Sequence, residues 1–295
     1  MAQAEVTNSA PVGDPSDIRA IPAELREFQS RFLQESLGTG ALDWRFRDTL
    51  AGFGAPLIAL PGLQGTGDIH YRLALRLHRL KLRTIAITPP AEPEVRRLAD
   101  SLAMLLDKLR LDRVHFDGSS IGGDLAQVFA QRHPERVRVL FIGNSFHDPS
   151  ISQAKYPTLD KVRAESAQAR LDAIIARTVK MAGSEPGQAE LRDALLAIVG
   201  HHQSAEALKA RVICLLMADA IGVVPIPSSR VVLIDSDDDT TISAQQREGL
   251  RKRYSRSSHY AISGGGHYPS VLRPEQLVEA IASHMQKSEV AVSST

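Results

Sequence analysis

The chain has 295 residues, 43% of them hydrophobic, and its 35 basic and 34 acidic residues leave a formal net charge of +1. This composition is typical of a globular protein with room for one large domain or two small ones. The near-neutral charge argues against nucleic-acid binding, which needs a basic surface. A single cysteine, Cys214, excludes an internal disulfide and suits a reducing compartment.

The first segments of the chain are a polar lead and then the beginning of a sheet. Residues 1–22 lack the basic and apolar segments of a signal peptide, so we expect a disordered lead. Helical spacing of apolar residues predicts a helix over 22–36. Residues 42–50 alternate between apolar and polar side chains, as a half-buried edge strand does. Residues 55–60 form a continuous apolar run, which is typical of a central strand.

From there the pattern alternates between strands and helices. Short apolar runs predict strands at 83–88, 113–116, 136–142, 230–234 and 258–262. Apolar residues at helical spacing predict helices at 69–80, 92–109, 125–133, 242–254 and 274–285. The basic side chains of 247–256 are expected on the solvated face of their helix. The alternation predicts an α/β fold, a mostly parallel sheet with helices on both faces.

The alternation stops between residues 149 and 229, where only helical runs occur. We interpret 149–229 as an inserted helical lid. The core would then be 23–148 together with 230–287, and 288–295 a polar tail. The Ala, Leu, Ile and Val content of the lid predicts an apolar part of the substrate. No apolar stretch is long enough to span a membrane, and we expect a cytoplasmic protein.

A Gly-x-Ser-x-Gly turn at 118–122 lies between a predicted strand and a predicted helix. A serine on such a sharp turn has its hydroxyl exposed, because glycines at the flanking positions let the chain pass closely. The helix that follows directs its first N–H groups at the same place, which suits a developing negative charge. Ser120 is therefore the candidate nucleophile, and the alternative is an ordinary tight turn.

A glycine-rich loop at 61–68 follows the predicted central strand. Acyl-transfer enzymes place an oxyanion donor on such a loop. The candidate donors are the backbone N–H groups of Leu63 and of Ile121, the residue after the nucleophile. The glycine spacing is not that of a dinucleotide-binding fingerprint. The alternative is a plain loop without an oxyanion role.

Two polar segments follow later strands and could complete a triad. Residues 235–239 hold four aspartates, and His267 follows three glycines. Serine is a poor nucleophile unless an imidazole takes its proton, and a carboxylate orients that imidazole. The order Ser120, Asp, His267 is the order of an α/β-hydrolase triad. The alternatives are a solvated acidic turn, a structural histidine, and Asp148 as the acid.

No motif implies a metal, nucleotide, flavin or other cofactor. The acidic turn is not an EF-hand calcium loop, because Thr240 stands where the loop needs glycine and Gln246 where it needs glutamate.

Over roughly residues 42–287 the chain resembles the α/β-hydrolase superfamily, and within it the maspardin group. The segments that carry the resemblance are 60–68, 109–115, 118–123, 143–151, 235–254 and 264–269. The maspardin pattern places the triad acid at Asp238. The broader hydrolase pattern, with an apolar residue three positions after the acid, places it at Asp239 before Ile242. We favour Asp238 as the acid and keep Asp239 as the alternative.

The resemblance and the residues together predict a serine esterase that acts on a small, partly apolar acyl substrate. Ser120, His267 and Asp238 would form the catalytic triad. The maspardin resemblance also implies an alternative, a non-catalytic binding or adaptor protein with a protein partner. A third reading keeps the same site but changes the chemistry to carbon–carbon hydrolysis, a lyase or a cyclase reaction.

Overall fold

The computed structural model describes residues 21–52, 54–181, 187–201 and 203–293, so the expected lead at 1–22 lies almost wholly outside the described residues. One eight-stranded sheet organises the molecule, in the order β1-β2-β4-β3-β5-β6-β7-β8. The strands are β1 (Gln34–Thr39), β2 (Leu42–Asp48), β3 (Leu57–Leu60), β4 (Thr84–Thr88), β5 (Val114–Ser119), β6 (Val137–Gly143), β7 (Val231–Ser236) and β8 (Ser258–Ile262). Strands β3 to β8 run parallel, and the β1–β2 hairpin joins β4 antiparallel.

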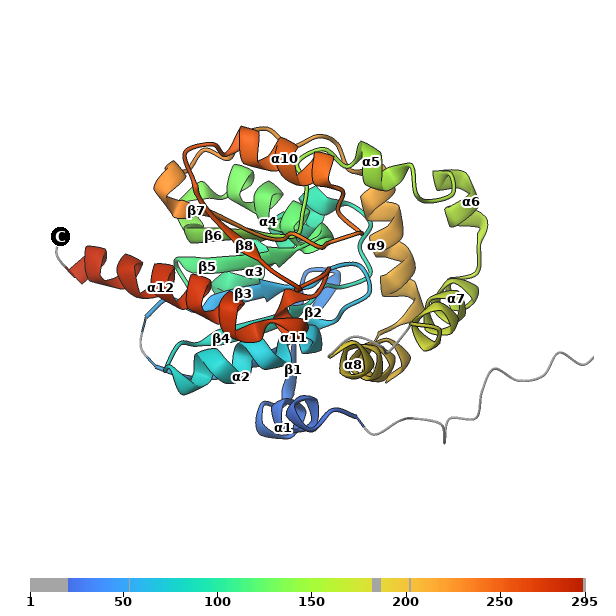
Figure 1. Ribbon diagram of the computed structural model, residues 1–295, viewed down its shortest axis with the longest axis horizontal. Coiled ribbons are helices and arrows are strands. Elements are labelled where there is room, and N and C mark those ends of the chain that lie inside the picture. The colour runs from blue at the N-terminus through green and yellow to red at the C-terminus, as the bar shows by residue number, and fades with distance from the viewer. Residues whose placement is uncertain (1–20, 53, 182–186, 202, 294–295) are drawn as a thin grey trace, which may run out of the picture.

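Helices cover both faces of this sheet (Figure 1). On one face, α2 (Tyr71–Arg79) packs beside α12 (Pro274–Ser293), and both contact strands. On the other face, α3 (Val95–Lys108) and α4 (Ile121–Arg132) pack together and share their core with α10 (Ala244–Arg253). Short apolar strands buried on both sides are what a parallel sheet between two helical layers requires, and the predicted α/β architecture is confirmed.

Both ends of the described chain differ from the expected elements. The helix predicted over 22–36 is α1 (Ala23–Arg31), which ends early and is followed by the unpredicted strand β1. Leu33 is 74% exposed, so the apolar residue that extended the helical pattern lies outside the core. At the other end α12 continues past 285 to Ser293, because Glu289 accepts a hydrogen bond from Ala55 N (3.2 Å) and lies 3.7 Å from Arg138.

Among the residues that the structure describes between β6 and β7, five helices gather together on the right of Figure 1. They are α5 (Ser150–Gln153), α6 (Leu159–Ala164), α7 (Ala167–Val179), α8 (Gln188–His201) and α9 (Ala205–Met217). Leu208, Val212 and Leu215 of α9 belong to the same hydrophobic cluster as the sheet residues Phe116 and Leu140. The division into core and lid remains a proposal. Among the described residues, no helix combines the length and apolar character that crossing a membrane needs.

Candidate active site

The turn between β5 and α4 holds Ser120 in a strained backbone conformation, with φ 56° and ψ −124°. Non-glycine residues rarely adopt a positive φ, and such strain is often found at functional sites. The flanking glycines permit it. A Cβ at Gly118 would lie 2.4 Å from the carbonyl oxygen of Gly122, and one at Gly122 would lie 2.4 Å from that of Leu60. Ser120 is therefore placed at the N-terminus of α4, close beside β3.

His267 lies on the loop after β8, and its Nδ1 is 2.9 Å from Asp239 Oδ2. The other oxygen, Asp239 Oδ1, accepts hydrogen bonds from Thr241 N (2.7 Å) and Ile242 N (3.1 Å). Burial alone would raise the pKa of Asp239, but the hydrogen bond and charge of His267, with the amides of Ile242 and Thr241, lower it below its ordinary value. Asp239 is therefore a buried carboxylate that stays ionised and fixes the histidine ring.

The structure does not bring the other two acids to His267, so the preference for Asp238 is corrected to Asp239. Asp238 is exposed, and its Oδ1 accepts from Gly266 N at 2.9 Å. Asp148 is also exposed and accepts from Ser150 N at 2.9 Å, at the start of α5. Asp239 turns inward because Ile242, three positions later, is buried and draws the loop into the core. That is the spacing of the broader hydrolase pattern.

Asn144, at the end of β6, connects the strand ends that carry these residues. Its side-chain oxygen accepts from Ser236 N (2.7 Å), and its side-chain nitrogen donates to Gly266 O (2.8 Å). The next residue, Ser145, donates its hydroxyl to Ser120 O at 2.7 Å. The pair thus fixes both the histidine loop and the serine turn. Sequence reasoning had only the maspardin-like pattern at 143–151 to mark them.

The glycine-rich loop after β3 lies directly beside the nucleophile. A Cβ at Gly62 would be 3.2 Å from Ser120 Cβ and 3.8 Å from Ser120 Oγ. Among the residues that the structure describes, neither Leu63 N nor Ile121 N is bonded to another main-chain group. Both amides are therefore available to a ligand beside Ser120, as an oxyanion hole requires.

A buried arginine of α9 holds this loop in place. Arg211 Nη1 donates to Leu63 O (3.1 Å), Gly62 O (3.3 Å) and Gly65 O, and its Nη2 donates to Gln203 Oε1 (2.9 Å). Burial lowers the pKa of the guanidinium to about 10, and it is still charged at neutral pH. Because the loop carbonyls turn toward Arg211, the Leu63 amide is left free. Nothing in the sequence singled out Arg211.

A second buried arginine holds the acid loop in the same manner. Arg247 of α10 donates to Asp239 O (2.8 Å), Asp237 O (3.2 Å) and Ile242 O. The expectation that the basic run 247–256 is a solvated face is therefore wrong for Arg247, which is buried. A basic residue within a charged run can face inward when backbone carbonyls of a neighbouring loop need donors.

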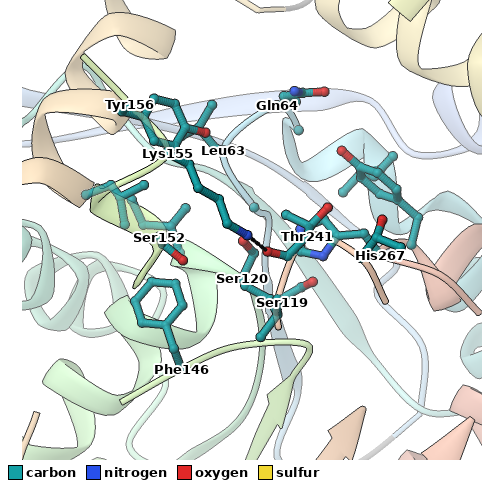
Figure 2. Close-up of a pocket in the computed structure, with 18 of the residues that line it drawn as sticks. Leu63, Gln64, Ser119, Ser120, Phe146, Ser152, Lys155, Tyr156, Thr241 and His267 are labelled. Carbon is teal, nitrogen blue, oxygen red and sulfur yellow. Dashed lines mark hydrogen bonds between the residues drawn. The ribbon is translucent and has the colours of Figure 1, made fainter. Parts of the chain in front are cut away.

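Ser120 and His267 line one cavity of about 580 Å³. Figure 2 shows both side chains facing this cavity, with Leu63 and Gln64 on its wall and Lys155 reaching across to Thr241. The insertion contributes polar as well as apolar lining: Ser152, Lys155, Tyr156, Pro157, Arg170, Arg177, Met181 and Leu215. Many apolar residues of the insertion, such as Leu208 and Val212, do not line the cavity and are buried in the hydrophobic core. Among the described residues, no group of side chains could hold a metal ion.

Comparison with known proteins shows the family and the fold of the chain. The sequence profile of a family described as "alpha/beta hydrolase fold" matches residues 56–274. Human maspardin is 27% identical over 236 residues, which cover 78% of this chain and 74% of maspardin.

Solved structures with the same fold include esterases and related hydrolases. A thermophilic esterase from Thermogutta terrifontis superposes with a TM-score of 0.67 at 18% identity, covering 86% of this chain and 98% of the esterase. An enol-lactonase from Burkholderia xenovorans LB400 superposes with a TM-score of 0.66 at 16% identity, covering 85% and 100% of the two chains. At these identities the likeness establishes the fold.

Proposed function

The chain belongs to the α/β-hydrolase fold family, and from this premise we propose that it is a serine hydrolase that cleaves a carboxylic ester or a related acyl bond. The observation that carries the proposal is the strained Ser120, which opens into the same cavity as a histidine whose Nδ1 is held by the buried Asp239. The names of structural neighbours, an esterase and an enol-lactonase, point to the same class of bond.

In the proposed mechanism His267 acts first as a base and then as an acid. Its Nδ1 bonds to Asp239, which leaves Nε2 to take the proton of the Ser120 hydroxyl as Oγ attacks the acyl carbon. The imidazolium then gives that proton to the leaving alcohol, and an acyl-enzyme remains. A water molecule then attacks the acyl carbon while the same nitrogen takes its proton. That proton passes to Ser120 Oγ as the acyl–oxygen bond breaks, which releases the acid and regenerates the serine.

The tetrahedral intermediates carry a negative oxygen that needs donors. In this proposal the amides of Leu63, after Gly62 beside Ser120, and of Ile121, the first residue of α4, bind that oxygen, assisted by the N-terminus of α4. Loss of one such donor typically lowers the rate by about 100–1000-fold. Asp239 remains ionised throughout, orients the ring of His267 and stabilises the imidazolium.

A second candidate function is a non-catalytic binding protein, favoured by the 27% identity to maspardin. Fluorophosphonate labelling followed by intact-mass measurement separates the two. We expect one adduct on the wild-type protein and none on Ser120→Ala, because only a base-activated serine attacks the phosphorus. A correctly folded wild-type protein that forms no adduct would contradict the hydrolase proposal and make a search for protein partners the next step.

A further inference from the structure

The walls of the active-site cavity carry a local excess of positive charge. Lys155, Arg170 and Arg177 line it, and among the lining residues that the structure describes there is no aspartate or glutamate. The charges of the whole chain nearly cancel, with 35 basic and 34 acidic residues. The excess of positive charge is therefore a local property of the cavity. All three cations come from the segment between β6 and β7.

The three cations are not equally compensated. Arg170 forms an ion pair with Glu165 and is largely neutralised. Lys155 Nζ instead donates to the neutral carbonyl of Thr241 at 2.6 Å, and Figure 2 shows this contact as a dashed line close to Ser120. A carbonyl oxygen orients an ammonium group but does not cancel its charge, and two of the three ammonium protons stay available. Lys155 is therefore a positioned donor that still carries its full charge.

Arg177 lies near the end of α7 and lines the cavity. Within the described part of the chain it has no ion pair with a carboxylate. Arg177, Tyr156 and Tyr268 line the same cavity. Burial raises the pKa of the two phenols, and the charge of Arg177 opposes that rise in both. Tyr268 in turn packs edge-on to His267, with ring centroids 5.3 Å apart. A guanidinium and the ring of His267 thus line the same cavity, with Tyr268 between the two elements that carry them.

We propose that the substrate carries a carboxylate, which Lys155 and Arg177 bind while its ester carbonyl lies at Ser120. A guanidinium binds a carboxylate through two parallel hydrogen bonds, and phenol hydroxyls can donate further ones. The substrate class is therefore a half-ester of a dicarboxylic acid, or a similar acyl compound with a free carboxylate. This inference rests on the proposed hydrolase function and adds the charge of its substrate.

The kinetic test compares mono-p-nitrophenyl glutarate with p-nitrophenyl pentanoate, which have the same chain length and differ in the terminal carboxylate. We expect the wild-type protein to favour the glutarate ester in kcat/KM. Arg177→Gln and Lys155→Gln should each lower the glutarate-to-pentanoate ratio about tenfold or more, since hydrogen bonds to charged groups contribute that much. Lys180→Gln removes the same charge from the end of α7 outside the cavity and should leave the ratio unchanged.

A binding measurement keeps this test separate from the test of catalysis. Monomethyl glutarate is titrated calorimetrically into Ser120→Ala and into the Ser120→Ala, Arg177→Gln double variant. If Ser120→Ala binds monomethyl glutarate and the double variant binds it about tenfold or more weakly, the carboxylate subsite is supported. This holds even if no ester is turned over. Equal binding by both variants, or a wild-type protein that favours pentanoate, overturns it. Absence of fluorophosphonate labelling together with specific binding would instead overturn the hydrolase proposal alone.

Discussion

Asp239 and Asp238 are adjacent in sequence, yet only one of them contacts the histidine. Asp239 Oδ2 lies 2.9 Å from His267 Nδ1, whereas Asp238 binds the backbone of Gly266. We predict that Asp239→Asn lowers kcat about 1,000–10,000-fold, because the amide supports the wrong tautomer of the ring. Asp238→Asn is the matched control and should cost less than about tenfold. Equal losses in steady-state ester hydrolysis would contradict the assignment.

The ionisation of Asp239 also makes stability depend on pH. Its folded-state pKa is lower than the ordinary value, so its contribution is present above the unfolded-state pKa and is lost as the pH falls through the folded one. We expect the free energies of unfolding of the wild-type protein and Asp239→Asn to converge below about pH 4. Urea denaturation at pH 3 to 7 measures this. If the difference in free energy of unfolding between the two proteins grew toward low pH, the pKa of Asp239 would be raised in the folded state, against this prediction.

The pKa of Asp124, on the first turn of α4, shifts in the opposite direction to that of Asp239. Both carboxylate oxygens are buried, and among the described residues neither has a hydrogen-bond partner. Burial raises the pKa of Asp124 to about 7. Its contribution to stability is therefore complete below the unfolded-state pKa and is lost as the pH rises through the folded one.

We predict that Asp124→Asn gains stability relative to the wild-type protein as the pH rises from about 4 to about 7, by at most about 1.4 kcal/mol per pH unit. The difference in free energy of unfolding should stay constant at higher pH, where Asp124 is ionised in both the folded and the unfolded wild-type protein. Urea denaturation of the two proteins between pH 4 and 9 measures it. A pH-independent difference would show that Asp124 is ionised in the folded state throughout.

At the scale of elements, α9 and the loop after β3 act as one unit through Arg211. Its guanidinium donates to Gly62, Leu63 and Gly65, so it determines which way the loop amides point. We predict that Arg211→Met lowers kcat for an ester about 10–100-fold with a smaller effect on KM, because the oxyanion donor is used mainly in the transition state. Stopped-flow labelling with fluorophosphonate should slow in parallel.

The substitution Arg211→Lys tests whether Arg211 orients the loop after β3 or only packs against it. Lys at 211 keeps a positive charge and one strong donor, so Arg211→Lys should recover part of the lost kcat. If Arg211→Met and Arg211→Lys lose stability but keep the wild-type kcat, the arginine has only a structural role.

At the scale of the whole molecule, helices α6, α7 and α9 of the insertion share a hydrophobic cluster with the sheet. Leu208 of α9 and Trp44 of β2 belong to the same buried cluster, and Trp44 is the only tryptophan of the chain. We predict that Leu208→Ala destabilises the protein by about 2–5 kcal/mol and shifts the Trp44 fluorescence transition together with the helical circular dichroism. Met104→Ala, at a side chain 46% exposed on α3, is the control and should change stability by less than about 0.5 kcal/mol. A helical transition that shifts alone would show an independently folding insertion.

Local patterns of the sequence determined the elements that build the sheet and the turns at the strand ends. Short, mostly apolar runs identified β3 to β7, because a strand buried on both faces favours apolar residues at every position. The glycines around Ser120 identified its turn, because only glycine fits where a Cβ would lie 2.4 Å from a carbonyl oxygen. These features depend on neighbours in the chain, so the order Ser120, Asp, His267 could be found without coordinates.

Tertiary structure decided which groups meet. The choice of Asp239 over Asp238 depends on how the loop turns once Ile242 is buried, which adjacent identical residues do not reveal. The inward orientation of Arg211 and Arg247 depends on carbonyl groups that are 146 and 8 positions away in the chain. The charge of the cavity likewise arises because side chains of one insertion converge on a distant serine turn. Such contacts are set by packing between elements, and only the choice of Asp239 had a local signal, the apolar residue three positions later.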